Sequence, residues 1–323
     1  MSMSKQRSRR AFLAAGGGAA LGGCVFLGTS PGLFGESQRG PTADVLAAGS
    51  LVVVIDEQVG PAFGRDTGFG YRGEFRGSNA IMRLVEGEHK HPDVVVSADA
   101  GLLREALVPD HAAWSVVFAA NEVGITYNPE TRVGDRLAAG EPWYRVLADS
   151  RVGAGRTDPN LDPLGYRTTM LFDLAERYYD QPGLAADLRT NSTVAARESH
   201  LLAGVEAGGR PAAYCYRNMA VDHDLPFVEL PPKLNFANPD YTDHYATASY
   251  TTDQGTTITG RPVLYAATVP NNARNPEAGR RFVQYLLENP DVLRRNGLTV
   301  PESLPKSSGQ LPQELRSVVE ADS

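Results

Sequence analysis

The chain has 323 residues, a length that allows a protein of two lobes with a substantial hydrophobic core. Its formal net charge is −7, and no basic cluster follows the N-terminal segment, which argues against a nucleic-acid-binding protein. Its two cysteines, Cys24 and Cys215, are too few for a disulfide framework.

The first 24 residues are typical of an export signal. Arg9 and Arg10 precede a short apolar stretch rich in Gly and Ala, which ends in LGGC. The arginine pair indicates export of a folded protein, and LGGC resembles a lipobox in which Cys24 becomes the lipidated first residue of the mature chain. A plain N-terminal membrane anchor with an incidental Cys24 is the alternative. We therefore expect an exported protein, anchored to the membrane at the extracellular face of the cell.

Residues 25–43 are predicted to form a tether between this signal and the folded part of the chain. They are mostly small or polar, and they are interrupted by Pro and Gly. One acyl chain binds a membrane only weakly, so we expect a second anchor as well.

The rest of the chain alternates short β-branched runs with amphipathic stretches. Strands are predicted at 50–56, 92–99, 211–216 and 261–270, with a longer β-rich run at 114–127 interrupted near Asn121. Helices are predicted at 100–107, 168–179, 195–208 and 276–289, the last of them stopped by Pro290. This alternation predicts an α/β protein with a mostly parallel sheet in each lobe.

Signals of catalytic or cofactor chemistry are weak in this chain. GFGYRG at 68–73 matches GxGxxG, but it lacks the flanking strand and helix of a nucleotide site, so we interpret it as a flexible turn. HKH at 89–91 and DHD at 222–224 lack partners at a metal-site spacing, and we interpret both as solvated loops. Asn191 begins a glycosylation sequon, whose occupancy the sequence leaves open. We expect no enzymatic activity and no cofactor.

Four stretches could form an anion site where strand ends lead into helices, and one of them is AAYCYRNMA at 212–220. Ser50 follows AAG, Ser78 opens a helical pattern, and Asp162 precedes the helix that begins at Pro163. A helix N-terminus presents unpaired N–H groups and a positive dipole end, which attract anions. Each residue taken alone is more simply explained as a helix N-cap.

From about residue 46 onward, the chain resembles the archaeal molybdate/tungstate-binding proteins of ABC importers. The segment DPxGYR, and NPDY after LPP, are its most specific parts. The matching stretches occur in family order, and they are AAGSL, RGSNAIMRLVEG, DVVVSADAGLL, WSVVFAANEVGITY, TDPNLDPLGYR, AAYCYRNMA, FVELPPKLNFANPDY and GRPVLYAATVP.

This resemblance implies a type II periplasmic-binding fold, in which two α/β lobes are joined by two crossover strands around a ligand cleft. It implies that residues 44–124 and 262–323 form lobe I and that residues 125–261 form lobe II. The implied function is a monomeric receptor that captures tungstate or molybdate and delivers it to the membrane subunits of an ABC permease. Sulfate, another small anion or an organic solute on the same fold is the alternative.

The resemblance also implies roles for single residues. Ser50 and Ser78 correspond to two serines that donate to the oxyanion, and Asp162 to the first of two carboxylates that bind the Mo or W atom in a six-coordinate form. Cys215 stands where the family has the second carboxylate, and it is either a ligand or a small buried hydrophobe. The oxyanion could therefore instead be tetrahedral, with Asp162 protonated or turned aside. Tyr241 of NPDY either reaches the cleft or packs within its turn.

Overall fold

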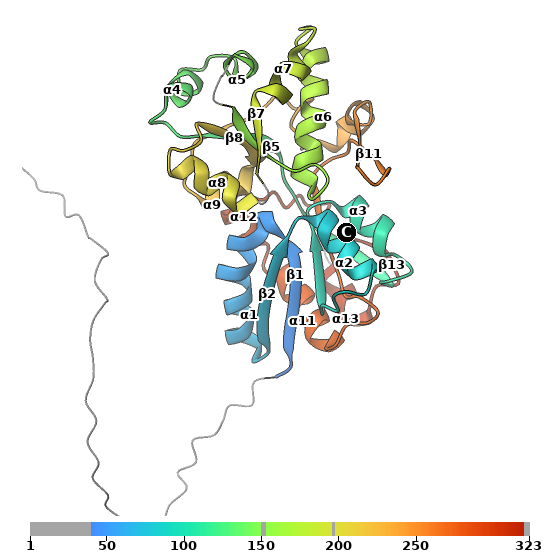
Figure 1. Ribbon diagram of the computed structural model, residues 1–323. Coiled ribbons are helices and arrows are strands. Elements are labelled where there is room, and N and C mark those ends of the chain that lie inside the picture. The colour runs from blue at the N-terminus through green and yellow to red at the C-terminus, as the bar shows by residue number, and fades with distance from the viewer. Residues whose placement is uncertain (1–39, 150–152, 196–197, 320–323) are drawn as a thin grey trace, which may run out of the picture. The chain divides into compact units, whose positions relative to one another are not determined.

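The computed structural model describes residues 40–149, 153–195 and 198–319, and these contain two larger β-sheets flanked by helices and a separate two-stranded sheet (Figure 1). The proposed signal, its Cys24 and tether residues 25–39 lie outside the described residues. Within the described ranges, no helix has the length and hydropathy that a membrane span requires.

The larger sheet, with its helices, is called lobe I here. Its strand order is β13-β4-β12-β3-β1-β2. Strand β1 pairs in parallel with β2 and with β3. Strand β12 pairs antiparallel with β3 and with β4, and β13 pairs antiparallel with β4. The strands are β1 (Thr42–Ala48), β2 (Gly70–Arg76), β3 (Val94–Ser97), β4 (Trp114–Ala120), β12 (Leu264–Thr268) and β13 (Lys306–Gly309).

Helices cover both faces of this sheet because successive residues of β1 point to opposite sides. Val45 packs with residues of η2, α1 and α11 on one face, and Leu46 packs with residues of α2 and α3 on the other. The helices of lobe I are η1 (Gly49–Leu51), η2 (Val52–Val59), α1 (Gly60–Thr67), α2 (Ser78–Glu86), α3 (Ala100–Leu107), α11 (Pro276–Glu288), α12 (Pro290–Arg295) and α13 (Gln313–Val319).

The smaller sheet, with its helices, is called lobe II. Its strand order is β7-β6-β8-β5-β9, with strands β5 (Val123–Tyr127), β6 (Ala154–Thr157), β7 (Ser192–Ala195), β8 (Ala212–Tyr216) and β9 (Phe227–Val228). A separate hairpin consists of β10 (Ser249–Thr251) and β11 (Thr257–Thr259). The helices are α4 (Arg132–Ala138), α5 (Trp143–Ala148), α6 (Pro163–Tyr178), α7 (Leu184–Thr190), α8 (Glu198–Glu206), α9 (Arg217–Asp222), η3 (Pro239–Tyr241) and α10 (Thr242–Tyr245).

Two chain segments cross between the sheets, and they lie side by side. One joins β4 to β5 through Asn121 and Glu122, and the other leads from β11 into β12. The backbone N–H of Asn121 donates to the carbonyl oxygen of Val263 at 3.1 Å. The interruption predicted near Asn121 is therefore confirmed, and it marks the passage from one sheet to the other.

Three sequence predictions about the sheets are wrong. GFGYRG at 68–73 was interpreted as a flexible turn, but β2 begins within it at Gly70. Residues 50–56 were expected to form a strand, but they belong to η1 and to η2, a π-helix. A short apolar run has no periodicity that separates a strand from a buried helix, and the strand is formed by the preceding TADVLAA instead. The sheets are also mixed rather than mostly parallel, because β5, β12 and β13 pair antiparallel with their neighbours.

Candidate functional site

Ser78 is fully buried at the N-terminus of α2 in lobe I. Its Oγ accepts a hydrogen bond from the backbone N–H of Ala98 at 3.0 Å. This bond fixes the oxygen at the end of β3, and the hydroxyl proton can be directed to a further acceptor.

Ser50 lies in η1, directly after β1, and its side chain is also buried. Its Oγ is 3.1 Å from the hydroxyl oxygen of Tyr265, which also accepts from Nδ2 of Asn121 at 3.2 Å. Nδ2 of Asn218 in lobe II donates to the Ser50 carbonyl oxygen at 2.5 Å. These bonds attach Ser50 to the crossover segments and to lobe II.

Asp162 is the N-cap of α6 in lobe II, and only 3% of its surface is exposed. Its Oδ1 accepts from the Gly165 N–H at 2.9 Å and from the Thr157 hydroxyl at 2.8 Å. Burial raises the pKa of this carboxyl to about 6, although its hydrogen bonds act in the opposite direction. The carboxylate therefore caps the helix, and its charge is destabilised by burial.

The N-termini of α2 and α6 meet at Gly77. The Ala80 N–H in α2 donates to the carbonyl oxygen of Leu161 at 3.3 Å. A Cβ atom at position 77 would lie 2.3 Å from that oxygen and 2.7 Å from Cβ of Asp162. The two lobes are thus closed on each other at this point, and Ser78 and Asp162 lie on either side of it.

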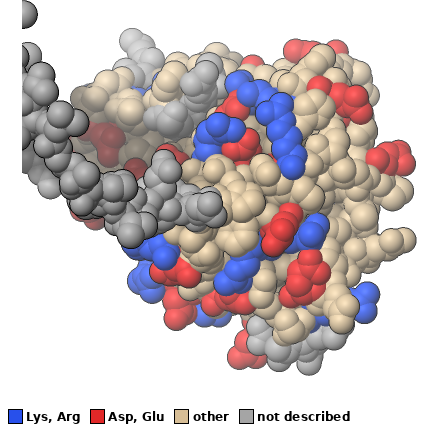
Figure 2. All heavy atoms as spheres, turned by 90° about the horizontal axis from the view of Figure 1, so that it is seen from below, with Lys and Arg blue, Asp and Glu red and all other residues tan. Residues whose placement is uncertain are grey.

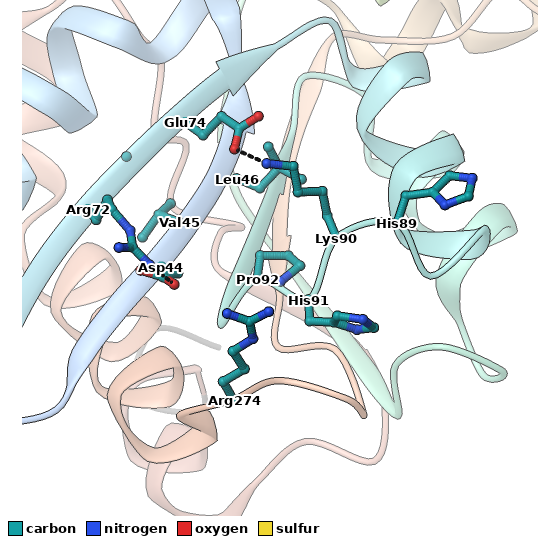
Figure 3. A pocket seen from close by; sticks show the side chains of 11 residues that line it. Asp44, Val45, Leu46, Arg72, Glu74, His89, Lys90, His91, Pro92 and Arg274 are labelled. Atoms are coloured by element: carbon teal, nitrogen blue, oxygen red, sulfur yellow. Dashed lines mark hydrogen bonds and ion pairs between the residues drawn. The ribbon is translucent and has the colours of Figure 1, made fainter.

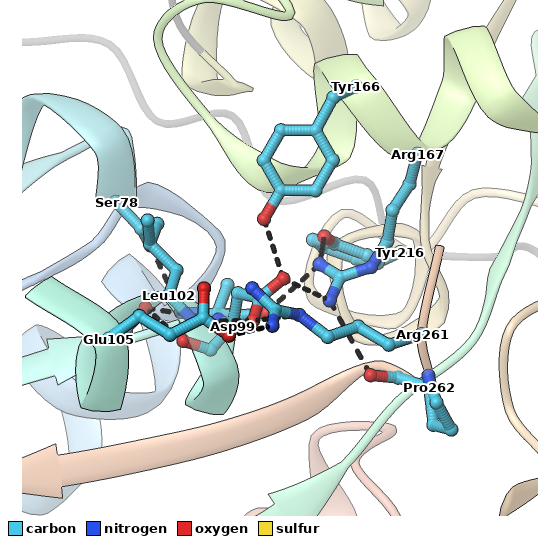
Figure 4. A network of polar contacts seen from close by, with 11 residues as sticks. Ser78, Asp99, Leu102, Glu105, Tyr166, Arg167, Tyr216, Arg261 and Pro262 are labelled. Atoms are coloured by element: carbon cyan, nitrogen blue, oxygen red, sulfur yellow. Dashed lines mark hydrogen bonds and ion pairs between the residues drawn. The ribbon is translucent and has the colours of Figure 1, made fainter. Parts of the chain in front are cut away.

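Lobe II also reaches Ser78 through a buried polar network (Figure 4). Arg167 of α6 donates through Nη1 to the Ala98 carbonyl oxygen at 3.1 Å and to the Tyr216 hydroxyl at 2.9 Å. The Tyr216 ring packs against that of Tyr265, with centroids 6.2 Å apart, and Tyr265 contacts Ser50. Ser50, Ser78 and Asp162 therefore belong to one continuous buried region between the sheets.

Asp99 and Arg167 are the residues of this region to which the sequence assigned no role. Oδ2 of Asp99 accepts from Nη2 of Arg167 at 2.8 Å and from the Tyr166 hydroxyl at 2.6 Å. Arg261 approaches Oδ1 of the same carboxylate, with Nε 2.9 Å away. The neighbouring arginines hold the pKa of Asp99 below its ordinary value despite its burial. Asp99 lies in the segment SAD and Arg167 in the segment GYR, but nothing in the sequence indicates that these two segments contact each other.

Cys215 lies in the middle of lobe II rather than at a free edge. It is fully buried in β8, where it is paired with Gly124 of β5. Tyr214 and Tyr216 on either side of it point toward α6, with the Tyr214 and Phe172 rings 5.0 Å apart. Because strand side chains alternate, Cys215 faces away from α6, the helix that Asp162 caps.

The Cys215 thiol is expected to be unreactive in the native protein. Burial raises its pKa strongly, so the thiolate that reacts with disulfide reagents is scarce. In a Cys24→Ser variant, whose one remaining cysteine is Cys215, a colourimetric disulfide reagent at pH 8 should label the protein only after denaturant is added. Rapid labelling of the native protein would contradict this placement.

Tyr241 packs within its own segment. Its ring centroid lies 5.9 Å from Nζ of Lys233 and 6.4 Å from the ring of Tyr245. Among the described residues, its ring contacts are with Lys233, His244 and Tyr245, and they include none of the three candidate site residues.

A pocket of about 530 Å³ lies on lobe I and is separate from this region (Figure 3). It is lined by basic and acidic side chains that include His89, His91 and Arg274, and Lys90 pairs with Glu74 at 2.8 Å. Figure 2 shows Lys and Arg interspersed with Asp and Glu on the face seen from below. Among the residues that the structure describes, no group of three or more His, Cys, Asp or Glu could hold a metal ion.

The pKa of Asp162 has a consequence for stability. A carboxyl whose pKa is raised from 3.8 to about 6 stabilises the folded state at low pH and loses that contribution as pH rises through about 6. The free energy of unfolding falls by about 3 kcal/mol over this range, because a shift of one pKa unit corresponds to about 1.4 kcal/mol. Urea unfolding of Asp162→Asn and the parent chain between pH 4 and 8 should show that the variant becomes relatively more stable as pH rises. Parallel stability curves would contradict the raised pKa.

The chain matches a known family over most of its length. A family described as bacterial extracellular solute-binding protein matches residues 43–299. An uncharacterized solute-binding protein of Halobacterium salinarum is 48% identical over 95% of this chain and 97% of its own. A putative ABC transporter molybdenum-binding protein of Haloferax volcanii is 39% identical over 96% of this chain and 98% of its own.

More distant comparisons extend these findings. A molybdate/tungstate-binding protein of Thermococcus kodakarensis is 30% identical over 77% of this chain and 78% of its own. The periplasmic molybdate-binding protein of Azotobacter vinelandii superimposes with a TM-score of 0.58 at 12% identity, covering 80% of this chain and 99% of that one. At that identity the likeness concerns the fold, which is the two-lobed fold of periplasmic binding proteins.

Proposed function

This chain belongs to the family of bacterial extracellular solute-binding proteins, and on that premise we propose that it captures tungstate or molybdate and delivers it to an ABC permease. The observation that carries the proposal is the meeting of the α2 and α6 N-termini, with Ser78 on one side and Asp162 on the other. The molybdenum-binding relative of Haloferax volcanii and the molybdate/tungstate-binding relative of Thermococcus kodakarensis support it.

Hydrogen-bond donors of lobe I would hold the oxyanion. The α2 terminus offers backbone N–H groups and the Ser78 hydroxyl, and Ser50 offers a second hydroxyl. Since these donors are buried, their hydrogen bonds to an anion are stronger than they would be in water. Closure of the lobes over the anion then excludes solvent.

Asp162 would select for a large central atom. A carboxylate repels an anion, and burial already destabilises its charged form. Contact with the Mo or W atom relieves both penalties, whereas the sulfur of sulfate cannot expand its coordination to accept it. We therefore propose that Asp162 contacts the metal atom and that sulfate binds more weakly.

The alternative ligand is sulfate, another small anion or an organic solute. It is favoured by Cys215, which replaces the second carboxylate of the resembling family and faces away from α6. In that case the oxyanion stays tetrahedral, and Asp162 serves only as a helix cap.

The cellular setting is also part of the proposal. We propose that residues 1–24 are a twin-arginine signal, that Cys24 carries the lipid, and that residues 25–41 tether a monomer outside the cell; Thr42 and Ala43, expected in the tether, belong to β1. We further propose that residues 42–122 and 262–323 form lobe I and that residues 123–261 form lobe II; the expected boundaries at 44 and 124 are each corrected by two residues, because β1 begins at Thr42 and β5 at Val123. Mass spectrometry of the membrane fraction would test the lipid on Cys24.

Calorimetric titration of the purified chain tests the ligand. Tungstate, molybdate, sulfate and phosphate are added separately in buffer with a high chloride concentration. We expect heat of binding from tungstate and molybdate at a one-to-one stoichiometry, and much weaker binding of sulfate. Equal affinity for sulfate would favour the tetrahedral alternative, and the absence of any binding would exclude the oxyanion function.

A further inference from the structure

We propose that the pocket on lobe I is a second binding site, which takes a small organic phosphate monoester and is independent of the oxyanion region between the lobes. The pocket measures about 530 Å³, which is in the range of small-molecule sites and larger than a bare phosphate needs. Strands β1 and β2, the loop at 89–92 and Arg274 form its walls (Figure 3). Because all of these belong to lobe I, the site does not depend on the position of lobe II.

The charges of this pocket leave a cation without a partner. Asp44 already pairs with Arg72. Glu74 pairs with Lys90 at 2.8 Å. Arg274 is exposed, and it has no hydrogen-bond or ion-pair partner among the residues that the structure describes. A guanidinium suits a phosphate group, which it can bind through two N–H groups at once. The surplus cation therefore favours an anionic ligand.

A buried carboxylate beside Asp44 fixes the geometry of these walls. Asp93 is fully buried, and its Oδ2 accepts from the backbone N–H of Asp44 at 2.9 Å. Its Oδ1 accepts from the backbone N–H of Asn275 at 2.5 Å. Asn275 directly follows Arg274, so Asp93 attaches the segment that carries Arg274 to β1. The site is thus built before a ligand binds, which lowers the ordering cost of binding.

The loop at 89–91 adds hydrogen-bond donors rather than a metal site. His89 and His91 both line the pocket, and an imidazole can donate an N–H whether it is neutral or charged. A metal ion would need more acidic or imidazole ligands in one place, and no group of three or more occurs among the described residues. The cations Arg72, Lys90 and Arg274 would also repel a metal ion.

Asp44 gives the site a preference for an anion that keeps a proton. Its Oδ1 is buried and has no hydrogen-bond partner in the described part of the chain. Glu74 differs, because its two oxygens accept from Arg76 and Lys90. A carboxylate oxygen can only accept, so a ligand group that meets it must donate. A phosphate monoester loses its last proton at about pH 6 and so still carries an O–H there. Sulfate and phosphate diesters are ionised without one.

Calorimetric titration at pH 6, with glycerol 3-phosphate as the probe, tests the site. We expect one molecule of the probe to bind each chain. Arg274→Gln should bind it at least about tenfold more weakly, the usual scale for losing a charged hydrogen bond. Sulfate and dimethyl phosphate should bind the parent chain at least about tenfold more weakly than the probe, because neither offers a donor to Asp44. Since Arg274 is exposed and unpaired, the variant should fold like the parent.

Arg281→Gln is the matched control. It removes the same charge from α11, where Arg281 pairs with Glu288 at 3.2 Å and does not line the pocket. We expect it to bind the probe like the parent chain. Equal losses in the two variants would reveal a general effect of charge and would overturn the site. Equal affinity of the parent for sulfate would overturn the selectivity, and binding of inorganic phosphate without binding of the ester would overturn the monoester assignment.

A competition experiment separates this pocket from the proposed oxyanion region. With tungstate at a saturating concentration, glycerol 3-phosphate should bind the parent chain with unchanged affinity and stoichiometry. Displacement of the probe by tungstate would place both ligands in one site and would overturn the second site. Should tungstate fail to bind the parent chain, the proposed function fails, and the comparison of Arg274→Gln with Arg281→Gln still decides the pocket.

Discussion

Replacing Gly77 with alanine is expected to weaken tungstate binding by about 10- to 100-fold. The φ angle of Gly77 is −63°, so alanine fits the local backbone, but its Cβ would lie 2.3 Å from the Leu161 carbonyl oxygen in the other lobe. Relieving such an overlap costs about 1–3 kcal/mol. That cost falls on the closed state, and each 1.4 kcal/mol corresponds to about tenfold in affinity. Isothermal calorimetry measures the change.

Gly64→Ala is the matched control for this prediction. A Cβ there would lie 3.5 Å from the Phe69 carbonyl oxygen, an ordinary contact, and the position is in α1 of lobe I. We expect the control to bind tungstate like the parent chain and to be equally or more stable, since alanine favours helix. A Gly77→Ala protein with parental affinity would show that the closure at this point is not part of ligand binding.

The second large effect is expected from Asp162→Asn. If the carboxylate contacts the Mo or W atom, the neutral amide should weaken tungstate binding at least about tenfold, the usual scale for losing a charge-assisted interaction. Asparagine is as good an N-cap as aspartate, so α6 should remain intact. Competition with radiolabelled tungstate at pH 8 measures the affinity independently of protein stability.

Asp162→Ala separates the two roles of this side chain. Loss of the cap should lower the free energy of unfolding by about 1 kcal/mol relative to Asp162→Asn. Both variants should lose tungstate affinity to a similar degree. Unchanged or tighter binding by Asp162→Asn would mean that Asp162 only caps α6 and that the oxyanion is bound as a tetrahedron.

The sequence predicted local structure well where one signal dominated. The helix at 100–107 has the same bounds as α3, and the helix at 276–289 ends at Glu288, just before Pro290. These segments carry their own periodicity and stop signals. The run at 50–56 has neither, and its helical form depends on burial against the rest of lobe I.

The candidate site was only partly predictable for the same reason. Ser78 and Asp162 were recognisable because Ser78 opens one helix and Asp162 precedes another, and the structure brings these helix termini together. The pairing of Asp99 with Arg167 was not recognisable, because 68 residues separate them and the contact arises only when two sheets close. The direction of Cys215 depends on the tyrosines beside it, whose packing against α6 is a tertiary contact.

Anomalous diffraction at the tungsten edge tests the central claim most directly. Crystals of the chain grown with tungstate should give one strong peak between the N-termini of α2 and α6, within bonding distance of Asp162 and hydrogen-bonded through its oxygens to Ser50 and Ser78. A peak only in the basic pocket around Lys90 and Arg274, or no ordered peak at all, would contradict the account.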